Sequence, residues 1–462
     1  MKKRVIVLGA GPCGLSTAWG LSQQDYQVTI IEKEELVGGL CQTINYQGFR
    51  FDLGGHRFIS EDTELVGAIL HLLNDDLLLR QRKSVIKFQG QELSYPLTFM
   101  DLVKKLSVGL LARVLREYLR KRTFALSHNP LDAISSSLEE WLIRHYGTTL
   151  YKLFFQPYST KLWGIPPEEM TPDWAGERIP PLRLTSIFLR PFRKKDSFRH
   201  YASQYLYPKE GIGQIFQEMA RQIKYHGGDI WLNSQVEKIY WEGSRVMAVE
   251  IKRDEKREIL ALDWLVVTIP LPTLINLLYP PLAPGLRELA GQLRYRSLRF
   301  LNLLIDSPAI SDNTWIYVPD RAFVISRIQE PRNRSPYNTP AGVTSLILEI
   351  PCSVGVQTWQ ADNLTLYQHC LNELSRLGIE LKGKVMDYFF TQAEHAYPIY
   401  HLGYQSARQT LLAASNALEN MLLLGRQGRF QYLFMDQVMC QGIEGARKIM
   451  GRCSIQIVPG GP

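Results

Sequence analysis

The sequence predicts an α/β protein in which two domains are interwoven, and two observations carry this expectation. Near the N-terminus, the short apolar runs Val5–Leu8 and Val28–Ile31 flank a helical stretch, Leu15–Leu21, which is the pattern of a βαβ unit. Near the other end, Leu422–Leu424 is another short buried-strand pattern and is followed by Gly425. We expect this late strand to join the sheet that the first two begin.

The middle of the chain supplies strands for both domains. Ile230–Ile239, Val246–Ile251 and Trp264–Ile269 read as further strands of the first domain. Leu298–Ile305 and Thr344–Ile350 are runs rich in apolar residues that we assign to a second sheet. The chain is therefore expected to cross between the two domains several times.

Helical patterns dominate Thr98–Lys121 and Ser137–Phe155, which we assign to a helical insertion in the second domain. Gln329–Gly342, rich in Pro, Asn and Arg, is expected to be a long loop. The complete expectation is a Rossmann-like domain interwoven with an α+β domain that binds the substrate. The expected boundaries are 1–85, 205–275 and 415–450 for the first domain, and 86–204 and 276–414 for the second.

The composition excludes several classes of protein. With 462 residues, 45% hydrophobic and 21% charged, the chain is neither collagen-like, of low complexity nor disordered. The net charge of +8 fits an anionic ligand or membrane surface, and equally an ordinary solvated exterior. The six cysteines are scattered without metal-ligand spacing, which predicts reduced thiols, no metal site and a cytoplasmic protein.

Two segments resemble targeting or membrane sequences, and we reject both. The basic start Met1–Arg4 precedes an apolar run, but the glycine pattern that follows explains that run as a strand. Trp264–Leu286 is uncharged and long enough to span a bilayer, yet five prolines would break a helix there.

The motif that carries the chemistry is Gly9–Gly14, read Gly-Ala-Gly-Pro-Cys-Gly, directly after the first strand. In such a fingerprint the first glycine allows a tight turn, the second lets backbone approach a pyrophosphate, and the third lets helix pack on strand. The helix N-terminus offers free N–H groups to that anion. Glu32 lies 18 residues after Gly14, where an acid binds a ribose hydroxyl, which favours FAD or NAD over NADP.

Two further blocks favour FAD. Glu32–Leu40 contains Gly38-Gly39 and resembles the second glycine signature of the flavin amine oxidase superfamily. Phe49–His56 resembles the next conserved block of the same superfamily, which lies beside the flavin in its members. The resemblance implies a fold of the amine oxidase or glutathione reductase type and FAD as the cofactor.

Later blocks resemble the UDP-galactopyranose mutases. Tyr158–Pro166, Ser326–Glu330, Ala396–Pro398 and above all Gly425–Asp436 match blocks of that family, as do Arg178–Arg183 and Arg294–Leu298. In the mutases, the counterparts of Arg327, Arg426, Tyr397 and Tyr432 surround the flavin and the substrate pyrophosphate. Arginine forks suit diphosphate oxygens because they bind them in bidentate fashion.

Two departures separate the chain from the mutases. Ile59 stands where those enzymes carry a second histidine. Tyr207–Gly213 instead resembles a stretch of protoporphyrinogen oxidases and phytoene desaturases. The resemblance thus places the chain in the protoporphyrinogen-oxidase-like group and implies an FAD-dependent oxidoreductase. The alternatives are a redox-neutral mutase and, more remotely, a non-catalytic protein like the Rab-GDP dissociation inhibitors.

The motifs and the resemblance together give a candidate site. In related proteins a valine of a returning strand contacts the adenine side of the flavin cofactor, and Val236 fits that place. The expected FAD contacts are Gly9, Gly11, Pro12, Cys13, Gly14, Glu32, Lys33, Gly39, Leu40, Gly55, His56, Arg57, Val236, Gly425, Arg426 and Met435. The expected catalytic residues are His56, Trp163, Arg327, Tyr397 and Tyr432.

Simpler interpretations of these residues stay open. Trp163 and Tyr432 also suit a packed core, Arg327 and Arg426 suit structural ion pairs, and His56 suits a turn. The expected partner is a small molecule, a nucleotide sugar or a polycyclic compound, and no nucleic-acid-binding module is recognisable.

Basic stretches leave membrane contact open. Thr98–Arg122 is amphipathic and basic, which fits either a helix packed on its own domain or peripheral contact with the inner face of an anionic membrane. A second cluster, Arg190–Arg199, reads as an exposed loop or as the flank of a substrate entrance. Neither stretch fixes the oligomeric state.

Overall fold

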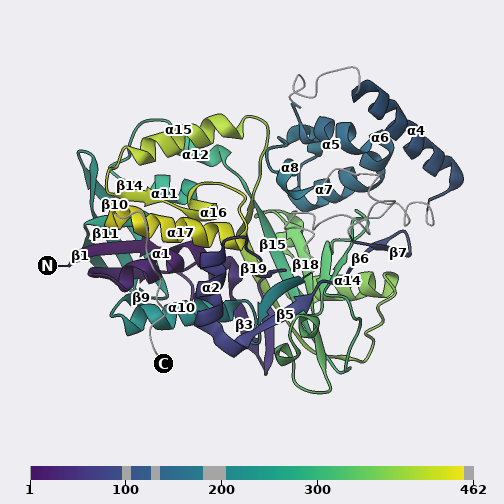
Figure 1. Cartoon of the computed structure of the whole chain (residues 1–462), viewed down its shortest axis with the longest axis horizontal. Coiled ribbons are helices and arrows are strands. Elements are labelled where there is room, and N and C mark those ends of the chain that lie inside the picture. The colour runs from purple at the N-terminus through teal and green to yellow at the C-terminus, as the bar shows by residue number, and fades with distance from the viewer. Residues whose placement is uncertain (1, 96–105, 126–135, 180–203, 452–462) are drawn as a thin grey trace.

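The computed structural model describes residues 2–95, 106–125, 136–179 and 204–451. Within these ranges, one parallel sheet joins the two ends of the chain, with the strand order β20-β13-β1-β2-β9 (Figure 1). Its strands are β1 (Lys3–Leu8), β2 (Tyr26–Ile31), β9 (Asp229–Trp231), β13 (Trp264–Val267) and β20 (Met421–Leu423). The predicted α/β class is confirmed, and the late strand does return to the first sheet.

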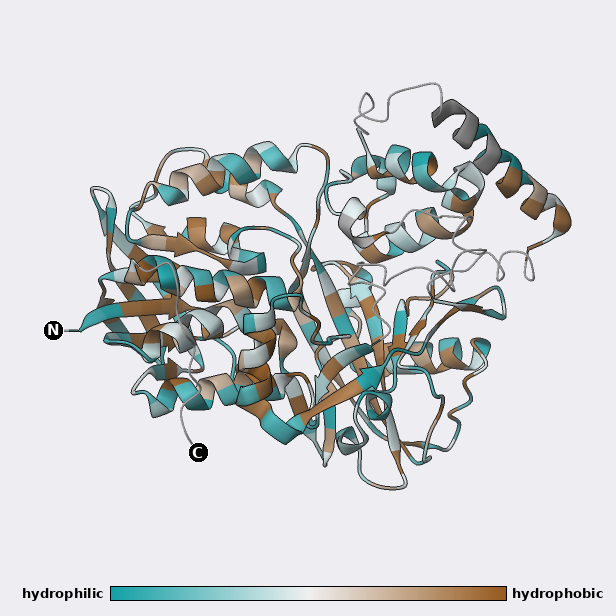
Figure 2. Ribbon diagram, viewed as in Figure 1, coloured by the Kyte–Doolittle hydropathy of each residue, from teal (hydrophilic) through white to brown (hydrophobic). Residues whose placement is uncertain are grey.

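Helices cover one face of this sheet because each presents an apolar stripe to it. Trp19, Phe216 and Met439, from three different helices, are fully buried in the cluster between them and the strands. The helices on this face are α1 (Pro12–Ser22), α2 (Thr63–Leu73), α10 (Gly213–Tyr225) and α17 (Met435–Met450). Figure 2 shows hydrophobic residues along β1, whereas the outer helix α15 alternates hydrophobic and polar positions.

The opposite face packs against a smaller sheet and three helices. Its strands, in the order β12-β11-β10-β14, are β10 (Ser234–Glu242), β11 (Arg245–Arg253), β12 (Lys256–Ala261) and β14 (Leu278–Tyr279). The helices are α11 (Leu271–Leu277), α12 (Leu286–Gln292) and α15 (Tyr404–Asn416). The predicted strand 230–239 is two strands, β9 and β10, because the backbone turns at Asn233 with φ of 49°.

The second large sheet has seven strands in the order β19-β15-β18-β17-β16-β6-β7. These are β6 (Ser84–Phe88), β7 (Gln91–Ser94), β15 (Tyr295–Ile305), β16 (Trp315–Tyr317), β17 (Arg327–Gln329), β18 (Thr344–Cys352) and β19 (Val385–Pro398). Its cover includes α13 (Gln357–Gln360) and α14 (Asn363–Arg376). Every residue of β18 is buried, and Glu349 is the one acid among its nine residues.

Short elements connect the two sheets. Two small ribbons, β3–β4 and β5–β8, lie between them. Their strands are β3 (Thr43–Tyr46), β4 (Phe49–Asp52), β5 (Leu77–Gln81) and β8 (Gln204–Pro208). The short helical turns are η1 (Gly39–Cys41), η2 (Asn74–Asp76), η7 (Pro331–Asn333), η8 (Pro336–Asn338) and α16 (Gly425–Gly428). The predicted long loop 329–342 therefore contains two ordered turns.

A group of helices sits beside the second sheet, at the upper right of Figure 1. It comprises α4 (Val108–Ala125), α5 (Leu138–Tyr146), α6 (Thr148–Leu150), η3 (Tyr151–Phe155), α7 (Gln156–Trp163), η4 (Pro167–Glu169) and α8 (Ala175–Arg178). The predicted helix 137–155 is interrupted at Gly147, whose φ of 91° lies outside the helical region. Residues 98–105 and the basic cluster 190–199 lie outside the described residues.

Among the described helices, none combines the length and the apolar character that crossing a bilayer requires.

Candidate active site

In the loop Gly9–Gly14, close packing of the protein requires glycine at two positions, and the remaining glycine faces open space. A Cβ on Gly14 would lie 2.1 Å from the carbonyl oxygen of Gly9, so only glycine lets α1 pack this closely on β1. Gly9 has φ of 101° and a Cβ there would lie 2.6 Å from Thr268 Oγ1. A Cβ on Gly11 would meet nothing within 4 Å. The space beside Gly11 is therefore left for something other than protein.

Glu32 ends β2 next to this loop. Its carboxylate accepts hydrogen bonds from the backbone N–H of Ala10 at 2.7 Å and of Glu34 at 3.0 Å. Burial raises the pKa of Glu32, and these backbone donors oppose that rise. The acid is thus held where β2 meets the glycine loop.

Lys33 and Val236 occupy different surroundings. The side chain of Lys33 is exposed and pairs with Glu34 at 3.3 Å. Val236 lies on β10, half-buried, two residues after Ser234, whose N–H donates to the backbone oxygen of Glu32 at 2.8 Å. Val236 therefore lies on the strand that a backbone hydrogen bond joins to Glu32.

The second glycine signature contacts the first. The N–H of Gly38 donates to the carbonyl of Ala10 at 2.8 Å, and a Cβ on Gly39 would lie 3.1 Å from Gly11 Cα. Leu40, the next residue, packs against the buried cluster that contains Phe51. Segments about thirty residues apart thus form one glycine-lined surface.

The C-terminal block reaches the same place. A Cβ on Gly425 would lie 2.9 Å from Cys13 Cβ, so this block touches the start of α1 directly. Pro12 begins α1, and no side chain caps that helix N-terminus. Met435 begins α17 and packs on the cluster beneath the first sheet. Backbone from both ends of the chain therefore surrounds the helix N-terminus.

Arg426 follows Gly425 and lies against two tyrosine rings that also contact each other. Its guanidinium carbon is 5.0 Å from the ring centre of Tyr397 and 4.4 Å from that of Tyr432. It donates a hydrogen bond to the carbonyl of Ala396. Within the described part of the chain, no carboxylate forms an ion pair with Arg426.

Trp163 completes an aromatic group with these tyrosines. Its ring centre lies 5.8 Å from Tyr397 and 5.6 Å from Tyr432, both in edge-to-face contact. Trp163 is 2% exposed, whereas the two tyrosines are half-buried. Trp163 is therefore covered by protein, whereas part of the surface of each tyrosine is available to contact a ligand.

Two charged groups fix the end of α7 that carries Trp163. Lys161 Nζ donates to the backbone oxygens of Val318 at 2.8 Å, Asp320 at 2.9 Å and Ile325 at 2.5 Å. Arg296 donates to the backbone oxygens of Lys161 and Leu162, both at 3.0 Å. Burial lowers the pKa of Lys161 to about 7. The helix is thereby tied to the loop between β16 and β17.

Arg327 carries its own counter-charge. Its Nη2 lies 2.6 Å from Glu349 Oε1, and the two side chains are 19% and 3% exposed. Burial opposes the charge on Arg327, and the Glu349 carboxylate outweighs burial, so the pKa of Arg327 stays above its ordinary value. A Cβ on Gly55 would lie 2.9 Å from the Arg327 guanidinium carbon. The ion pair is therefore packed directly against the Gly54–His56 turn.

His56 is neutral in this setting. Burial, followed by the charges of Arg327, Arg426 and Arg334, lowers its pKa to about 3. Its buried Nδ1 makes no hydrogen bond within the described residues. His56 can therefore give or take a hydrogen bond but does not supply a positive charge at neutral pH.

A buried ion pair lies beneath this turn, and the sequence analysis did not find it. Arg334 Nη1 lies 3.1 Å from Asp52 Oδ2, with side chains 0% and 1% exposed. Asp52 also accepts from Tyr207 Oη at 2.6 Å and from Thr43 Oγ1 at 2.7 Å. The position of Asp52 just before Gly54-Gly55 was the available signal. This network fixes the backbone that presents His56.

Arg57 and Tyr317 form the neighbouring wall. Arg57 stacks 5.6 Å from the ring centre of Trp315, and burial, followed by the charge of Arg82, lowers its pKa to about 10. Burial raises the pKa of Tyr317, but the charges of Arg82, Arg327 and Arg57 outweigh burial, and its pKa lies below the ordinary value. Tyr317 was not predicted, because nothing near it in the sequence marks it.

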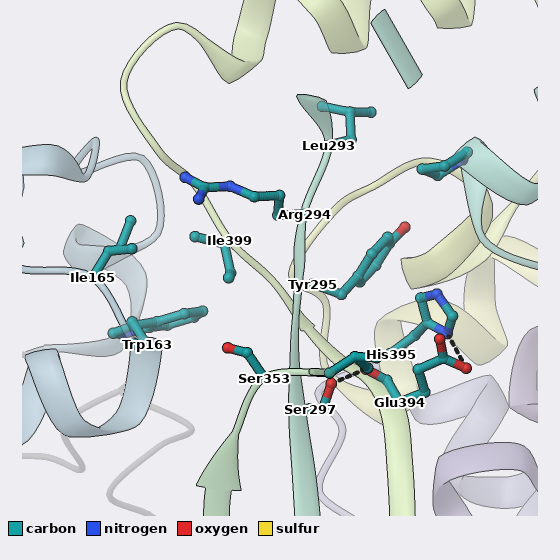
Figure 3. A pocket seen from close by; sticks show the side chains of 13 residues that line it. Trp163, Ile165, Leu293, Arg294, Tyr295, Ser297, Ser353, Glu394, His395 and Ile399 are labelled. Carbon is teal, nitrogen blue, oxygen red and sulfur yellow. Dashed lines mark hydrogen bonds and ion pairs between the residues drawn. The ribbon is translucent and has the colours of Figure 1, made fainter. Parts of the chain in front are cut away.

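A cavity of about 360 Å³ lies against Trp163 at the start of β15 and the end of β19 (Figure 3). Arg294 and Tyr295 line it from one strand, and Glu394 and His395 from the other. Glu394 and His395 face each other at 3.9 Å. The cavity shares Trp163 with the aromatic group and so lies next to it.

The predicted residues thus form two groups. The first lies around the N-terminus of α1 and contains Gly9, Gly11, Pro12, Cys13, Gly14, Glu32, Gly39 and Gly425. Leu40 follows Gly39, Val236 lies on β10, which is bonded to Glu32, and Met435 begins α17; their contacts with FAD stay predictions. The second contains His56, Arg57, Trp163, Arg327, Tyr397, Arg426 and Tyr432, with Gly55 against Arg327. Lys33 pairs with Glu34, and its contact with FAD stays a prediction.

These residues fit FAD. The open space at Gly11 faces an uncapped helix N-terminus, which suits a pyrophosphate. Glu32 stands at the ribose position of such a site. The unpaired Nδ1 of His56 and the uncompensated charge of Arg426 suit a polar ring system that becomes anionic when reduced.

Residues 12–450 match the family described as flavin containing amine oxidoreductase. Among curated proteins, the tobacco mitochondrial protoporphyrinogen oxidase is 28% identical over 218 residues, 44% of this chain and 41% of its own. The 4,4'-diapophytoene desaturase of Methylomonas is 25% identical over 279 residues, 54% of this chain and 51% of its own. The Fusarium fujikuroi phytoene desaturase is 50% identical over 54 residues, 12% of this chain and 10% of its own. The chain thus spans about half or less of the length of these relatives.

Solved structures share the whole fold. A reduced UDP-galactopyranose mutase matches with a TM-score of 0.80 and 22% identity, covering 98% of this chain and 94% of the other. A putative protoporphyrinogen oxidase from Exiguobacterium matches with a TM-score of 0.73 and 18% identity, covering 97% and 99%. The predicted superfamily is confirmed, and so is the flavin-dependent oxidoreductase class at the level of the family. The chain belongs to the flavin-containing amine oxidoreductase family, and its cofactor is FAD.

Proposed function

We propose that the protein uses FAD to oxidise a small organic molecule that lies against Tyr397 and Tyr432. The observation that carries the proposal is the Arg327–Glu349 pair, at 2.6 Å and nearly buried. Because Glu349 neutralises Arg327, Arg327 and Arg426 do not form a clamp of two uncompensated arginines for a diphosphate. This arrangement favours a substrate recognised mainly through apolar and aromatic contact, such as a polycyclic compound.

FAD, when bound, supplies the chemistry by accepting a hydride or its equivalent from a substrate carbon. The half-buried rings of Tyr397 and Tyr432 would orient that carbon, and the buried Trp163 packs against both rings and excludes water behind them. His56, neutral at physiological pH, offers its Nδ1 for a hydrogen bond without adding charge. The proton that accompanies the hydride leaves to solvent.

A second candidate is redox-neutral isomerisation of a nucleotide sugar. Arg426 favours it, since a guanidinium without a carboxylate partner among the described residues suits a phosphate oxygen. Ile59 and the paired Arg327 count against it. A non-catalytic binding protein remains the third candidate, and protein that cannot be reconstituted with FAD would support that one.

The test is an anaerobic single turnover. Purified holoprotein is mixed with a porphyrinogen, a polyene or UDP-galactopyranose, and flavin absorbance near 450 nm is followed without added reductant. We expect bleaching by a polycyclic or polyene substrate, slower in Trp163→Phe although FAD content is unchanged. Isomerisation of the nucleotide sugar only after dithionite reduction, with no bleaching by the other substrates, would contradict the proposal.

We also propose a cytoplasmic location with peripheral contact to an anionic membrane through α4. Arg113, Arg116 and Arg120 are exposed on this helix, and Val108 at its start is 85% exposed. Co-sedimentation with phosphatidylserine vesicles, compared with phosphatidylcholine vesicles, tests this. Binding that is equal for the two, or unchanged in Arg113→Gln/Arg116→Gln, would argue against it.

A further inference from the structure

A second cavity, of about 450 Å³, has a lining that contains none of the predicted site residues. The turn after β5 forms one side, with Arg80, Arg82 and Lys83. The segment before β16 and the η7 turn form the other, with Asp312 and Arg332. The volume suits a small ligand rather than a macromolecule.

The lining of this cavity is strongly positive. Asp312 is its one carboxylate, and it pairs with Lys83 at 2.8 Å. Arg80 donates to a backbone oxygen, that of Asn333, at 3.3 Å. In the ranges that the structure describes, neither Arg80 nor Arg332 forms an ion pair. The arginines thus bring positive charge to the cavity that its own acid does not neutralise.

Hydrogen bonds that involve none of the arginines hold the side of the cavity that contains Asp312 and Arg332. Asn333 Nδ2 donates to the backbone oxygens of Ser311 and Asn313, both at 2.9 Å, and so joins the two segments of one side. The buried carboxylate of Glu330 accepts from the N–H of Ile310 at 3.0 Å and of Ser311 at 2.8 Å. Because these bonds fix the rim, a ligand would find the cations already in place.

The cavity and the candidate flavin site lie on two sides of one wall, which contains Trp315 and Tyr317. The guanidinium of Arg82 lies 5.8 Å from the ring centre of Trp315 and donates to Tyr317 Oη at 3.3 Å. On the far side, Trp315 Nε1 would lie 2.7 Å from a Cβ on Gly55. One layer of aromatic side chains therefore separates this cavity from the turn that presents His56.

We propose that this cavity binds the phosphate group of a small molecule, at a site separate from that of FAD. Arginine forks and a lysine ammonium provide the donors that tetrahedral phosphate oxygens require. Phosphate is favoured over a lone carboxylate because cations approach from both sides of the cavity. The proposal does not depend on which reaction the flavin site catalyses.

The test uses the holoprotein, so that FAD occupies its own pyrophosphate site. Sodium pyrophosphate is titrated in a phosphate-free buffer and binding is measured by calorimetry, with citrate as the carboxylate probe. We expect pyrophosphate to bind, and to bind at least about tenfold more weakly in Arg80→Gln/Arg332→Gln, because charge-assisted hydrogen bonds are lost. Lys83→Gln is a second, separate variant, expected to weaken binding by a smaller factor.

The matched control is Arg287→Gln/Lys256→Gln, which removes the same charge from two exposed positions elsewhere. Its pyrophosphate affinity should stay within about twofold of the original, because distant surface charges are screened. FAD content and thermal unfolding, measured for every variant, establish that folding is unchanged. A bound anion should also perturb the flavin spectrum, since only Trp315 and Tyr317 separate it from the Gly55 turn.

Three outcomes would overturn the proposal. The first is no pyrophosphate binding by the holoprotein. The second is equal affinity in Arg80→Gln/Arg332→Gln, or an equal loss in the control, since either places the anion elsewhere. The third is tighter binding of citrate than of pyrophosphate, which would make the site one for carboxylates.

Discussion

The two ends of the flavin site are built in different ways. At the phosphate end, around Gly9–Gly14, the surface is formed by backbone and by glycines without side chains, and Glu32 adds a carboxylate. At the ring end, contact is made by buried or half-buried charged and aromatic side chains, among them Arg327 and Arg426. The structure of the phosphate end therefore depends mainly on steric fit, and that of the ring end depends mainly on the balance of charge.

This difference predicts how each end fails. At the phosphate end, a methyl group added to a glycine that packs against backbone would push α1 away from β1. At the ring end, removal of one charge leaves its partner buried without compensation. The following substitutions test this contrast, from the largest expected effect to the smallest.

Glu349→Gln should destabilise the protein by about 3–5 kcal/mol, because it leaves the nearly buried Arg327 without its carboxylate. Urea unfolding measures the loss. The matched control is Glu64→Gln, which breaks the exposed pair with Arg447 and should cost less than about 1 kcal/mol. Similar losses for the two variants would show that burial of the Arg327 pair has no energetic consequence.

Gly14→Ala should destabilise the protein by about 3 kcal/mol and lower FAD content, because its Cβ would lie 2.1 Å from the Gly9 oxygen. Gly11→Ala meets no protein atom within 4 Å, so the apoprotein should unfold at an unchanged temperature. Its FAD affinity should still fall, because the methyl group occupies the approach of the pyrophosphate. Thermal unfolding and flavin absorbance separate these effects, and equal behaviour of the two variants would contradict the assignment.

His56→Gln should have the smallest effect, and only in acid. The pKa of His56 is about 3 in the folded protein, against about 6.5 in the unfolded chain. The unfolded chain therefore binds more protons between these values, and acidification from pH 6.5 towards 3 destabilises the fold. His56→Gln should reduce that loss by on the order of 1 kcal/mol, as His56 keeps partial solvent contact. Unfolding midpoints of the apoprotein at pH 7 and pH 4 measure it, and an identical pH dependence would refute the neutral state.

Much of the phosphate end could be predicted because its determinants are local. The spacing from Gly9 to Gly14 and on to Glu32 follows from one strand, one turn and one helix, whose geometry is set by neighbouring residues. Adjacency to Glu32 does not by itself place the side chain of Lys33, which is exposed and pairs with Glu34. Whether a side chain faces the site depends on the turn after the strand.

The partners at the ring end could not be predicted in the same way. Glu349 lies 22 residues after Arg327, and a lone acid in a wholly buried strand was the only signal of a buried partner. For Tyr317 and Arg334, the sequence around the residue contains no such signal. Ion pairing is decided by strand order, and β17 lies beside β18 because of the whole seven-stranded sheet.

The sequence alone determined the α/β class, the flavin-binding glycine blocks and the return of the C-terminal strand, because periodicity and glycine spacing express local backbone geometry. The tertiary structure alone decided that Arg327 is neutralised by Glu349 while Arg426 is not, and that Arg80 and Arg332 share a cavity. These facts depend on which distant segments become neighbours. Charge balance is a property of such neighbours, and no local pattern encodes it.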